Sequence, residues 1–310
     1  MLHTGGITME FISYDNKKIW YTVWEAEAPR ACIQVMTGLA EMADYYEEFA
    51  AVMNKAGYTV ALHEFRGHGR STDEYGEGNL FRNYARDGAQ LCDMIRRTHP
   101  GLPVVLFGHS LGTTVSQIAI YEKMARWDGV MYTGPSHSTF HIGRRDELLD
   151  EVDQCISKYG PEAESLLIYR EVFIPLNAPF PDEKSPFSFI TTDRKKWEWI
   201  ASLPYTSPAY SNRFFHDFII LQADISVVET LENTKPPLID TPVLLMTGSD
   251  DVTASNGKYG DIQAVLLKKA GCKDVTSIVY PGLRHSLLQE VESGRKKVLK
   301  NITEWMAQRF

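Results

Sequence analysis

Short apolar runs alternate with longer amphipathic stretches through the first half of the chain. The apolar runs lie at residues 31–36, 59–62 and 104–107, and the amphipathic stretches lie at 41–56 and 80–97. Strands covered by helices on both faces of a parallel sheet need nearly continuous apolar sequence. The alternation therefore predicts an α/β fold with a mainly parallel sheet.

Both ends of the chain extend this pattern. Residues 10–14 and 19–24 are rich in aromatic and β-branched side chains and flank a turn-prone Asp-Asn pair, which predicts an antiparallel hairpin. Toward the C-terminus, we expect a strand at 275–280 between helices at 256–270 and 290–310.

The alternation of apolar runs and amphipathic stretches stops after residues 129–135 and resumes only at 241–246. We expect the interval 136–240 to form a helical cap on a core made of residues 1–135 and 241–310. Aromatic side chains recur in this interval, at residues 173–180, 187–189, 197–199 and 214–218. Two interpretations stay open: the rings pack the insertion onto the core, or they form the apolar underside of a lid.

The segment 108–112 reads Gly-His-Ser-Leu-Gly, follows the apolar run 104–107 and precedes a helix-like stretch at 113–124. A serine on a tight strand-to-helix turn needs very small neighbours, because the backbone is strained and another part of the chain passes close by. Glycine two residues before and two residues after the serine meets this need. Ser110 is therefore the predicted nucleophile.

A serine hydroxyl at neutral pH needs a histidine as general base and a carboxylate that orients the histidine. Asp251 directly follows an apolar strand, and His285 follows the next strand, at the carboxyl ends where α/β sheets carry reactive side chains. The order Ser110, Asp251, His285 is the order found in α/β-hydrolases. The neighbouring Asp250 is expected to be a turn or cap residue. The other histidines considered are expected to have packing or hydrogen-bonding roles: His63, His68, His109 and His216.

The tetrahedral oxyanion of acyl transfer needs two backbone N–H donors. One belongs to the residue after the nucleophile, which is Leu111. The other is expected from the loop after the third strand, residues 37–40, where we assign it to Leu39.

The motifs that carry a family resemblance lie at residues 38–41, 66–71, 108–112, 248–251 and 281–285. With them, the sequence resembles serine α/β-hydrolases of the monoacylglycerol lipase and lysophospholipase group, which overlaps the S33 peptidase-like hydrolases, over nearly its whole length. The resemblance implies an eight-stranded, mainly parallel sheet flanked by helices, with a helical cap after strand 6. It also assigns the acid of the family's Gly-x-x-Asp pattern to Asp251.

Three residues depart from the family pattern. Thr37 and Met42 stand where relatives usually have histidine, and Glu64 stands where an aspartate commonly precedes the Arg-Gly-x-Gly loop. These changes leave the catalytic residues intact. They weaken the transfer of glyceride specificity, because the altered loop borders the acyl-binding cleft.

Composition and motifs exclude several other functions. The net charge is −8 with scattered basic residues, so we expect no nucleic-acid partner. Neither a complete dinucleotide fingerprint nor a P-loop occurs, and the spaced pair His137 and His141 lacks the metalloprotease glutamate, so we expect no cofactor and no metal.

Three features of the sequence bear on where the protein is located in the cell. Its four cysteines form no Cys-x-x-Cys pair, the N-terminus lacks the regions of a signal peptide, and no run approaches membrane-spanning length. We expect a cytoplasmic protein.

The leading functional hypothesis is hydrolysis of a carboxylic ester with a lipid-like acyl chain through an acyl-serine intermediate. The substrate is a small-molecule or lipid ester, and the cap makes transient contact with a lipid surface.

Other functions stay open. The same triad serves an S33-type aminopeptidase, a thioesterase or an acyltransferase, and a non-catalytic ligand-binding module is a further alternative. An aminopeptidase needs carboxylates for the substrate ammonium group, which Glu151, Asp153 or residues 162–164 supply in the sequence.

Overall fold

A computed structural model describes residues 5–71, 76, 78–135, 144–203, 210–224 and 238–310. Its centre is an eight-stranded sheet in the order β1-β2-β4-β3-β5-β6-β7-β8. The strands from β3 onward pair in parallel, whereas β1 pairs with β2, and β2 with β4, in antiparallel fashion. The predicted α/β class and the mainly parallel sheet are confirmed.

The strands match the apolar runs of the sequence closely. Their bounds are β1 (Ile7–Ile12), β2 (Lys18–Trp24), β3 (Ala31–Met36), β4 (Tyr58–His63), β5 (Val104–His109), β6 (Gly129–Thr133), β7 (Val243–Gly248) and β8 (Val275–Tyr280). All residues of the five central strands, β3 to β7, are buried. This complete burial explains why their sequences are apolar without alternation.

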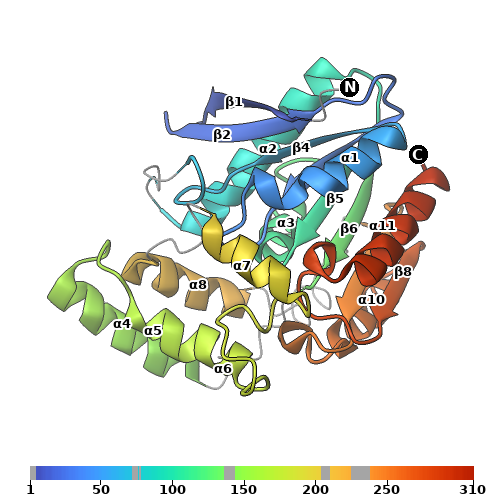
Figure 1. The fold of residues 1–310 in the computed structure, drawn as a ribbon. Helices are drawn as coiled ribbons and strands as arrows, with labels where there is room; N and C mark the ends of the chain where they lie inside the picture. The colour runs from blue at the N-terminus through green and yellow to red at the C-terminus, as the bar shows by residue number, and fades with distance from the viewer. Residues whose placement is uncertain (1–4, 72–75, 77, 136–143, 204–209, 225–237) are drawn as a thin grey trace.

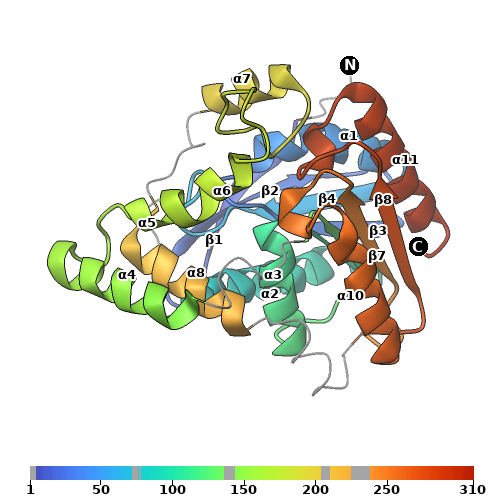
Figure 2. The ribbon, with the colours of Figure 1, turned by 90° about the horizontal axis from the view of Figure 1, so that it is seen from below.

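Helices cover both faces of the sheet (Figures 1 and 2). Their bounds are α1 (Glu47–Lys55), α2 (Leu80–Thr98), α3 (Leu111–Tyr121), α10 (Lys258–Lys269) and α11 (Glu292–Ala307). The apolar side chains of α2, α3 and α10 form one core cluster with the sheet, and those of α1 and α11 form a second. Successive residues of β5 alternate between the two clusters, as the pleat of a strand requires.

The starts of α1 and α3 differ from the predicted residues for local reasons. The stretch 41–56 opens with a short 3-10 turn, η1 (Ala43–Tyr46), and α1 starts only after it, because the side chain of Glu41 bonds back to Gly38 and closes a loop. Helix α3 starts at Leu111 rather than residue 113, because the turn between β5 and α3 consists of Ser110 alone.

The described parts of the chain between β6 and β7 contain several helices and lie beside one end of the sheet (Figure 1). Its elements are α4 (Arg145–Tyr159), α5 (Leu166–Ile168), η4 (Tyr169–Phe173), α6 (Ile174–Asn177), α7 (Arg194–Ser202) and α8 (Asn212–Asp224). Aromatic rings join α8 to the core: the Phe214 ring lies 5.4 Å from the ring of Phe81 on α2 and 5.3 Å from that of Tyr210. His137 and His141 lie outside the described residues.

We predict that Gly112→Ala destabilises the fold by about 3 kcal/mol, because overpacking against rigid backbone cannot be relieved by side-chain rotation. A methyl group at this position would lie 2.0 Å from the carbonyl oxygen of Met36. Gly5→Ala is the control, since nothing lies within 4 Å of its added Cβ. Equal urea midpoints for the two variants would contradict the prediction.

Candidate active site

Ser110 occupies a strained backbone position between β5 and α3. Its φ is 50° and its ψ is −120°, in the region of positive φ that side chains rarely adopt. The flanking glycines allow this turn: an added Cβ on Gly108 would lie 3.1 Å from the carbonyl oxygen of Gly112, and one on Gly112 would overlap the backbone of Met36. The Ser110 side chain is half-buried, which leaves it accessible at the turn. This is the strand-turn-helix geometry of a nucleophile elbow.

The structure brings the three sequence-predicted residues together. His285 lies in the loop after β8, with its Nε2 atom 2.8 Å from the Oγ atom of Ser110. Its Nδ1 atom lies 3.1 Å from Oδ2 and 3.2 Å from Oδ1 of Asp251, which is fully buried after β7. Asp250 is exposed and accepts a hydrogen bond from Ser249 instead. Asp251, and not Asp250, is therefore the aspartate that contacts His285.

Thr253 belongs to the same cluster, although the sequence did not reveal it. Its backbone N–H and its hydroxyl both donate to Oδ1 of Asp251, at 2.9 and 2.7 Å. Its hydroxyl oxygen also lies 2.8 Å from Nδ1 of His285. An Asp-x-Thr sequence suggests the backbone contact of a helix cap, but it gives no sign of a histidine 32 positions later.

The surroundings keep Asp251 ionised. Burial, the largest single influence, raises the pKa of its carboxyl group, but the opposing effects of His285 and Thr253 hold the pKa below its ordinary value. A carboxylate at this position can orient the imidazole ring and balance its positive charge.

Glu41 is a second residue that the sequence did not identify. Its buried carboxylate accepts hydrogen bonds from the backbone N–H of Gly38, at 2.8 Å, and from the hydroxyl of Tyr46, at 2.5 Å. The other carboxylate oxygen lies 3.4 Å from Nε2 of His109, whose ring centre is 5.0 Å from that of His285. Glu41 therefore links the loop after β3 to the nucleophile elbow.

Burial lowers the pKa of His109, and the neighbouring Glu41 opposes that effect only partly. A lowered pKa favours the neutral ring at neutral pH. This suits a packing partner of His285, because a second positive charge beside the base would disfavour its protonation.

The two nominated oxyanion donors lie on adjoining segments. The first turn of α3 lies directly against the carbonyl groups of Met36 and Thr37, so the loop that carries Leu39 adjoins the helix start that carries Leu111. Within the described part of the chain, neither the Leu39 nor the Leu111 backbone N–H donates a hydrogen bond. Unpaired N–H groups at a helix N-terminus are suited to an anionic oxygen.

The three departures from the family pattern have different surroundings. Thr37 is fully buried, and its hydroxyl has no hydrogen-bond partner among the described residues. Met42 is buried in the core cluster that includes α1. Glu64 is buried and accepts from the backbone N–H and the guanidinium of Arg70, at 2.5 and 2.7 Å, so it fixes the loop after β4.

Residues 180–191 of the insertion pack directly on the loop of His285. The backbone N–H of Ser286 donates to the carbonyl of Ile190 at 2.7 Å, and that of His285 donates to the carbonyl of Phe189 at 3.4 Å. The Phe189 ring centre lies 5.9 Å from the imidazole centre. Part of the insertion therefore packs against one side of His285.

Arg284 reinforces this contact. Its guanidinium forms two hydrogen bonds with Glu183, at 2.6 and 2.9 Å, and donates to the carbonyl of Ser188 at 2.6 Å. It also lies 3.9 Å from the ring centre of Phe180. The residue immediately before His285 thus contacts a ring, a carboxylate and two backbone carbonyls of the inserted segment, the second carbonyl being that of Thr191 at 3.4 Å.

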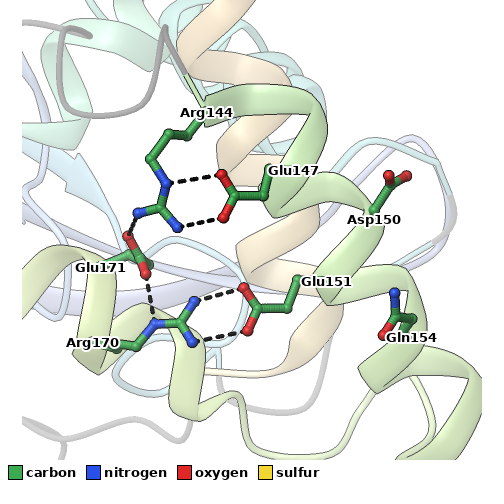
Figure 3. Close-up of a pocket in the computed structure, with 7 residues that line it drawn as sticks. All are labelled: Arg144, Glu147, Asp150, Glu151, Gln154, Arg170 and Glu171. Atoms are coloured by element: carbon green, nitrogen blue, oxygen red, sulfur yellow. Dashed lines mark hydrogen bonds and ion pairs between the residues drawn. The ribbon is translucent and has the colours of Figure 1, made fainter.

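The carboxylates considered for binding an amino terminus lie elsewhere, on and after α4. Glu151 accepts two hydrogen bonds from Arg170, at 2.8 and 2.6 Å, within a network that also contains Arg144, Glu147 and Glu171 (Figure 3). Asp153 lies 3.8 Å from His216, Glu162 lies 3.7 Å from Arg213, and Glu164 accepts from Tyr169. The charge of Glu151 is therefore already balanced by arginine.

Two further observations concern the described residues alone. They contain no group of three or more His, Cys, Asp or Glu side chains arranged to hold a metal ion. None of their helices combines the length and apolar character needed to span a bilayer.

The chain is similar to known proteins over nearly its whole length. The family model described as serine aminopeptidase, S33, matches residues 27–292. A monoglyceride lipase homolog of Monkeypox virus is 25% identical over 306 residues, which cover 95% of this chain and 96% of the relative. Human monoglyceride lipase is 25% identical over 301 residues, covering 96% of this chain and 89% of the relative.

Solved structures share the whole fold. A highly thermostable carboxyl esterase from Bacillus coagulans, in complex with glycerol, superposes with a TM-score of 0.87 at 21% identity, covering 98% of this chain and 99% of the other. A monoglyceride lipase variant from Saccharomyces cerevisiae gives a TM-score of 0.71 at 19% identity, covering 97% and 94%. The fold is that of an α/β-hydrolase, and the chain is an enzyme that belongs to the serine aminopeptidase S33 family.

Proposed function

We propose that this enzyme hydrolyses carboxylic esters with a lipid-like acyl chain through an acyl-serine intermediate. The observation that carries the proposal is the 2.8 Å contact between Oγ of Ser110 and Nε2 of His285, whose other nitrogen faces the buried Asp251. The preference for esters is supported by relatives named monoglyceride lipase and by structural neighbours named carboxyl esterase and lipase.

In this proposal, Oγ of Ser110 attacks the ester carbonyl while Nε2 of His285 accepts the hydroxyl proton. Asp251 holds the imidazole and balances its transient positive charge. The N–H groups of Leu39 and Leu111 bind the oxyanion. His285 then returns the proton to the leaving alcohol, and a water molecule activated by the same base hydrolyses the acyl-serine.

We further propose that residues 136–240 are a cap on the core of residues 1–135 and 241–310, and that the cap makes transient contact with a lipid surface. Three large apolar side chains on its outer helices are mostly exposed: Tyr159 at 62%, Leu166 at 75% and Ile174 at 65%. Exposed apolar side chains of this size support contact with an apolar partner.

The other uses of the same triad have weaker support. Glu151, one of the carboxylates expected to be available for the substrate ammonium group of an aminopeptidase, is paired with Arg170. A thioesterase or an acyltransferase would share the whole triad and differ only in substrate or acceptor. A non-catalytic binding module would not need the unbroken contacts that run from Ser110 through His285 to Asp251.

A cytoplasmic location is also part of the proposal. Burial raises the pKa of the Cys32 thiol to about 12 and that of the Cys92 thiol to about 11. Protonated, buried thiols that form no disulfide suit a reducing compartment.

We predict that Ser110→Ala lowers kcat for p-nitrophenyl ester hydrolysis by a factor on the order of 10⁴ or more, because the nucleophile is lost. A fluorophosphonate probe should label the wild-type enzyme and leave this variant unlabelled. Ser202→Ala, at the exposed end of α7, is the matched control and should behave as wild type. Full activity in Ser110→Ala would refute the proposed nucleophile.

We predict that kcat/KM rises with acyl-chain length from acetate to medium-chain esters, by up to about fourfold per buried methylene. The same measurements should include a matched thioester and an aminoacyl anilide, with the ester cleaved fastest. A preference for the anilide would instead support an aminopeptidase.

We predict that Arg284→Met destabilises the enzyme by about 2 kcal/mol, because the partly buried Glu183 loses its partner while the apolar stem of the side chain is kept. Lys296→Met breaks a pair whose side chains are each about 70% exposed and should cost no more than about 0.5 kcal/mol. Urea unfolding measures both. Indistinguishable midpoints would show that the Arg284 contact adds nothing to stability.

A further inference from the structure

Three oxygen atoms lie within hydrogen-bonding distance of Nδ1 of His285. The nearest is the hydroxyl oxygen of Thr253, at 2.8 Å, and the carboxylate oxygens of Asp251 lie at 3.1 and 3.2 Å. The hydroxyl oxygen is also 2.7 Å from Oδ1 of Asp251. The threonine hydroxyl thus contacts both the base and its orienting carboxylate, which also contact each other directly.

The chemistry of these groups fixes the position of each proton. An ionised carboxylate only accepts hydrogen bonds, so the single hydroxyl proton of Thr253 points to Asp251. A lone pair of the same oxygen then faces Nδ1 of His285, which must be the protonated nitrogen. The unprotonated Nε2 is left to accept the proton of Ser110, as the proposed reaction needs.

We propose that Thr253 is a positioning residue of the triad. Its hydroxyl oxygen shares the Nδ1 proton of His285 with Asp251, and its hydroxyl proton stabilises the charge of the Asp251 carboxylate. This inference rests on the proposed function of Ser110, Asp251 and His285. Thr253 acts through His285 and Asp251 and does not contact the reacting atoms.

Because Thr253 and Asp251 are both buried, only the Thr253 hydroxyl, and not water, can fill this role. The Thr253 residue is 7% exposed and Asp251 is fully buried, so water has little access to replace a missing donor. Two donors from one residue, the N–H and the hydroxyl, converge on Oδ1. The other oxygen, Oδ2, stays directed at the imidazole.

Other titratable groups lie near His285 but contact different atoms. His109 packs its ring 5.0 Å from that of His285 and lies 3.4 Å from Glu41. Arg284, the preceding residue, is paired with Glu183, and its backbone N–H donates to Glu290. Among the described residues, the hydrogen-bond partners of Nδ1 are Asp251 and Thr253 only. A change at position 253 therefore acts directly at this nitrogen.

The test is Thr253→Val, which keeps the branched shape and removes the hydroxyl. Asp251 then loses a neutral donor and attracts the imidazolium more strongly, so the acidic limb of the kcat/KM profile moves to higher pH by about 0.5 to 1 unit. At neutral pH we expect kcat/KM to fall by about 3- to 10-fold, mainly through kcat. The Nδ1 proton resonance of His285 should shift in the proton NMR spectrum.

Three companion variants make the test specific. Thr253→Ser keeps the hydroxyl and should restore the wild-type profile, and Thr253→Ala should reproduce the shift if the valine variant folds poorly. Thr247→Val removes another buried threonine hydroxyl, which bonds to the carbonyl of Gly257, and should leave the profile unchanged.

A wild-type pH profile and Nδ1 resonance in both Thr253→Val and Thr253→Ala would overturn the inference. So would an equal shift in Thr247→Val, or a failure of Thr253→Ser to restore activity. These outcomes leave the proposed function standing if the wild-type enzyme hydrolyses esters and its Ser110 reacts with the fluorophosphonate probe. A wild-type enzyme that does neither would overturn the proposed function, and this inference with it.

Discussion

The contact between Gly112 and the end of β3 is the constraint on which the site depends. Because an added Cβ would lie 2.0 Å from the carbonyl oxygen of Met36, the first turn of α3 can approach β3 only with glycine there. This approach forces the whole reversal from β5 to α3 onto Ser110, which takes a positive φ. It also sets Leu39 and Leu111 on adjoining segments. One close backbone contact therefore governs the position of both Ser110, the proposed nucleophile, and the proposed oxyanion donors.

Buried carboxylates hold the loops around that contact. One lies in the loop at the carboxyl end of each of β3, β4, β7 and β8, and each accepts a backbone N–H of its own loop. The pairs are Glu41 with Gly38, Glu64 with Arg70, Asp251 with Thr253, and Glu290 with Arg284. All four are buried, where a charge-assisted bond to the backbone is strong and has few competitors. Asp251 differs from the other three because its remaining oxygen faces a histidine whose other ring nitrogen contacts the hydroxyl of Ser110.

The sequence predicted what depends on local pattern and strand order. Apolar runs located the central strands, and the carboxyl ends of parallel strands must share one edge, so Ser110, Asp251 and His285 were expected to meet. Thr253 and Glu41 were not found, because their roles depend on contacts across the fold. The bond from Thr253 to His285 spans 32 positions, and whether Glu41 faces His109 depends on how the loop after β3 closes. Neither residue type signals such a contact by itself.

Hydrogen bonds join the inserted segment to the loop that carries His285. Glu290 accepts the N–H groups of Arg284 and Thr192 and also contacts the Thr192 hydroxyl, so one buried carboxylate joins the loop of His285 to the insertion. Arg284 adds its pair with Glu183 on the same side. Residues 180–192 therefore cannot swing away without breaking bonds that hold the histidine loop. Helix α6 is tied to the same segment, because the side chain of Asn177 donates to the carbonyl of Pro186 and accepts from the backbone N–H of Phe189. Any opening movement of the proposed cap that keeps His285 in contact with Ser110 and Asp251 must therefore leave both α6 and residues 180–192 in place.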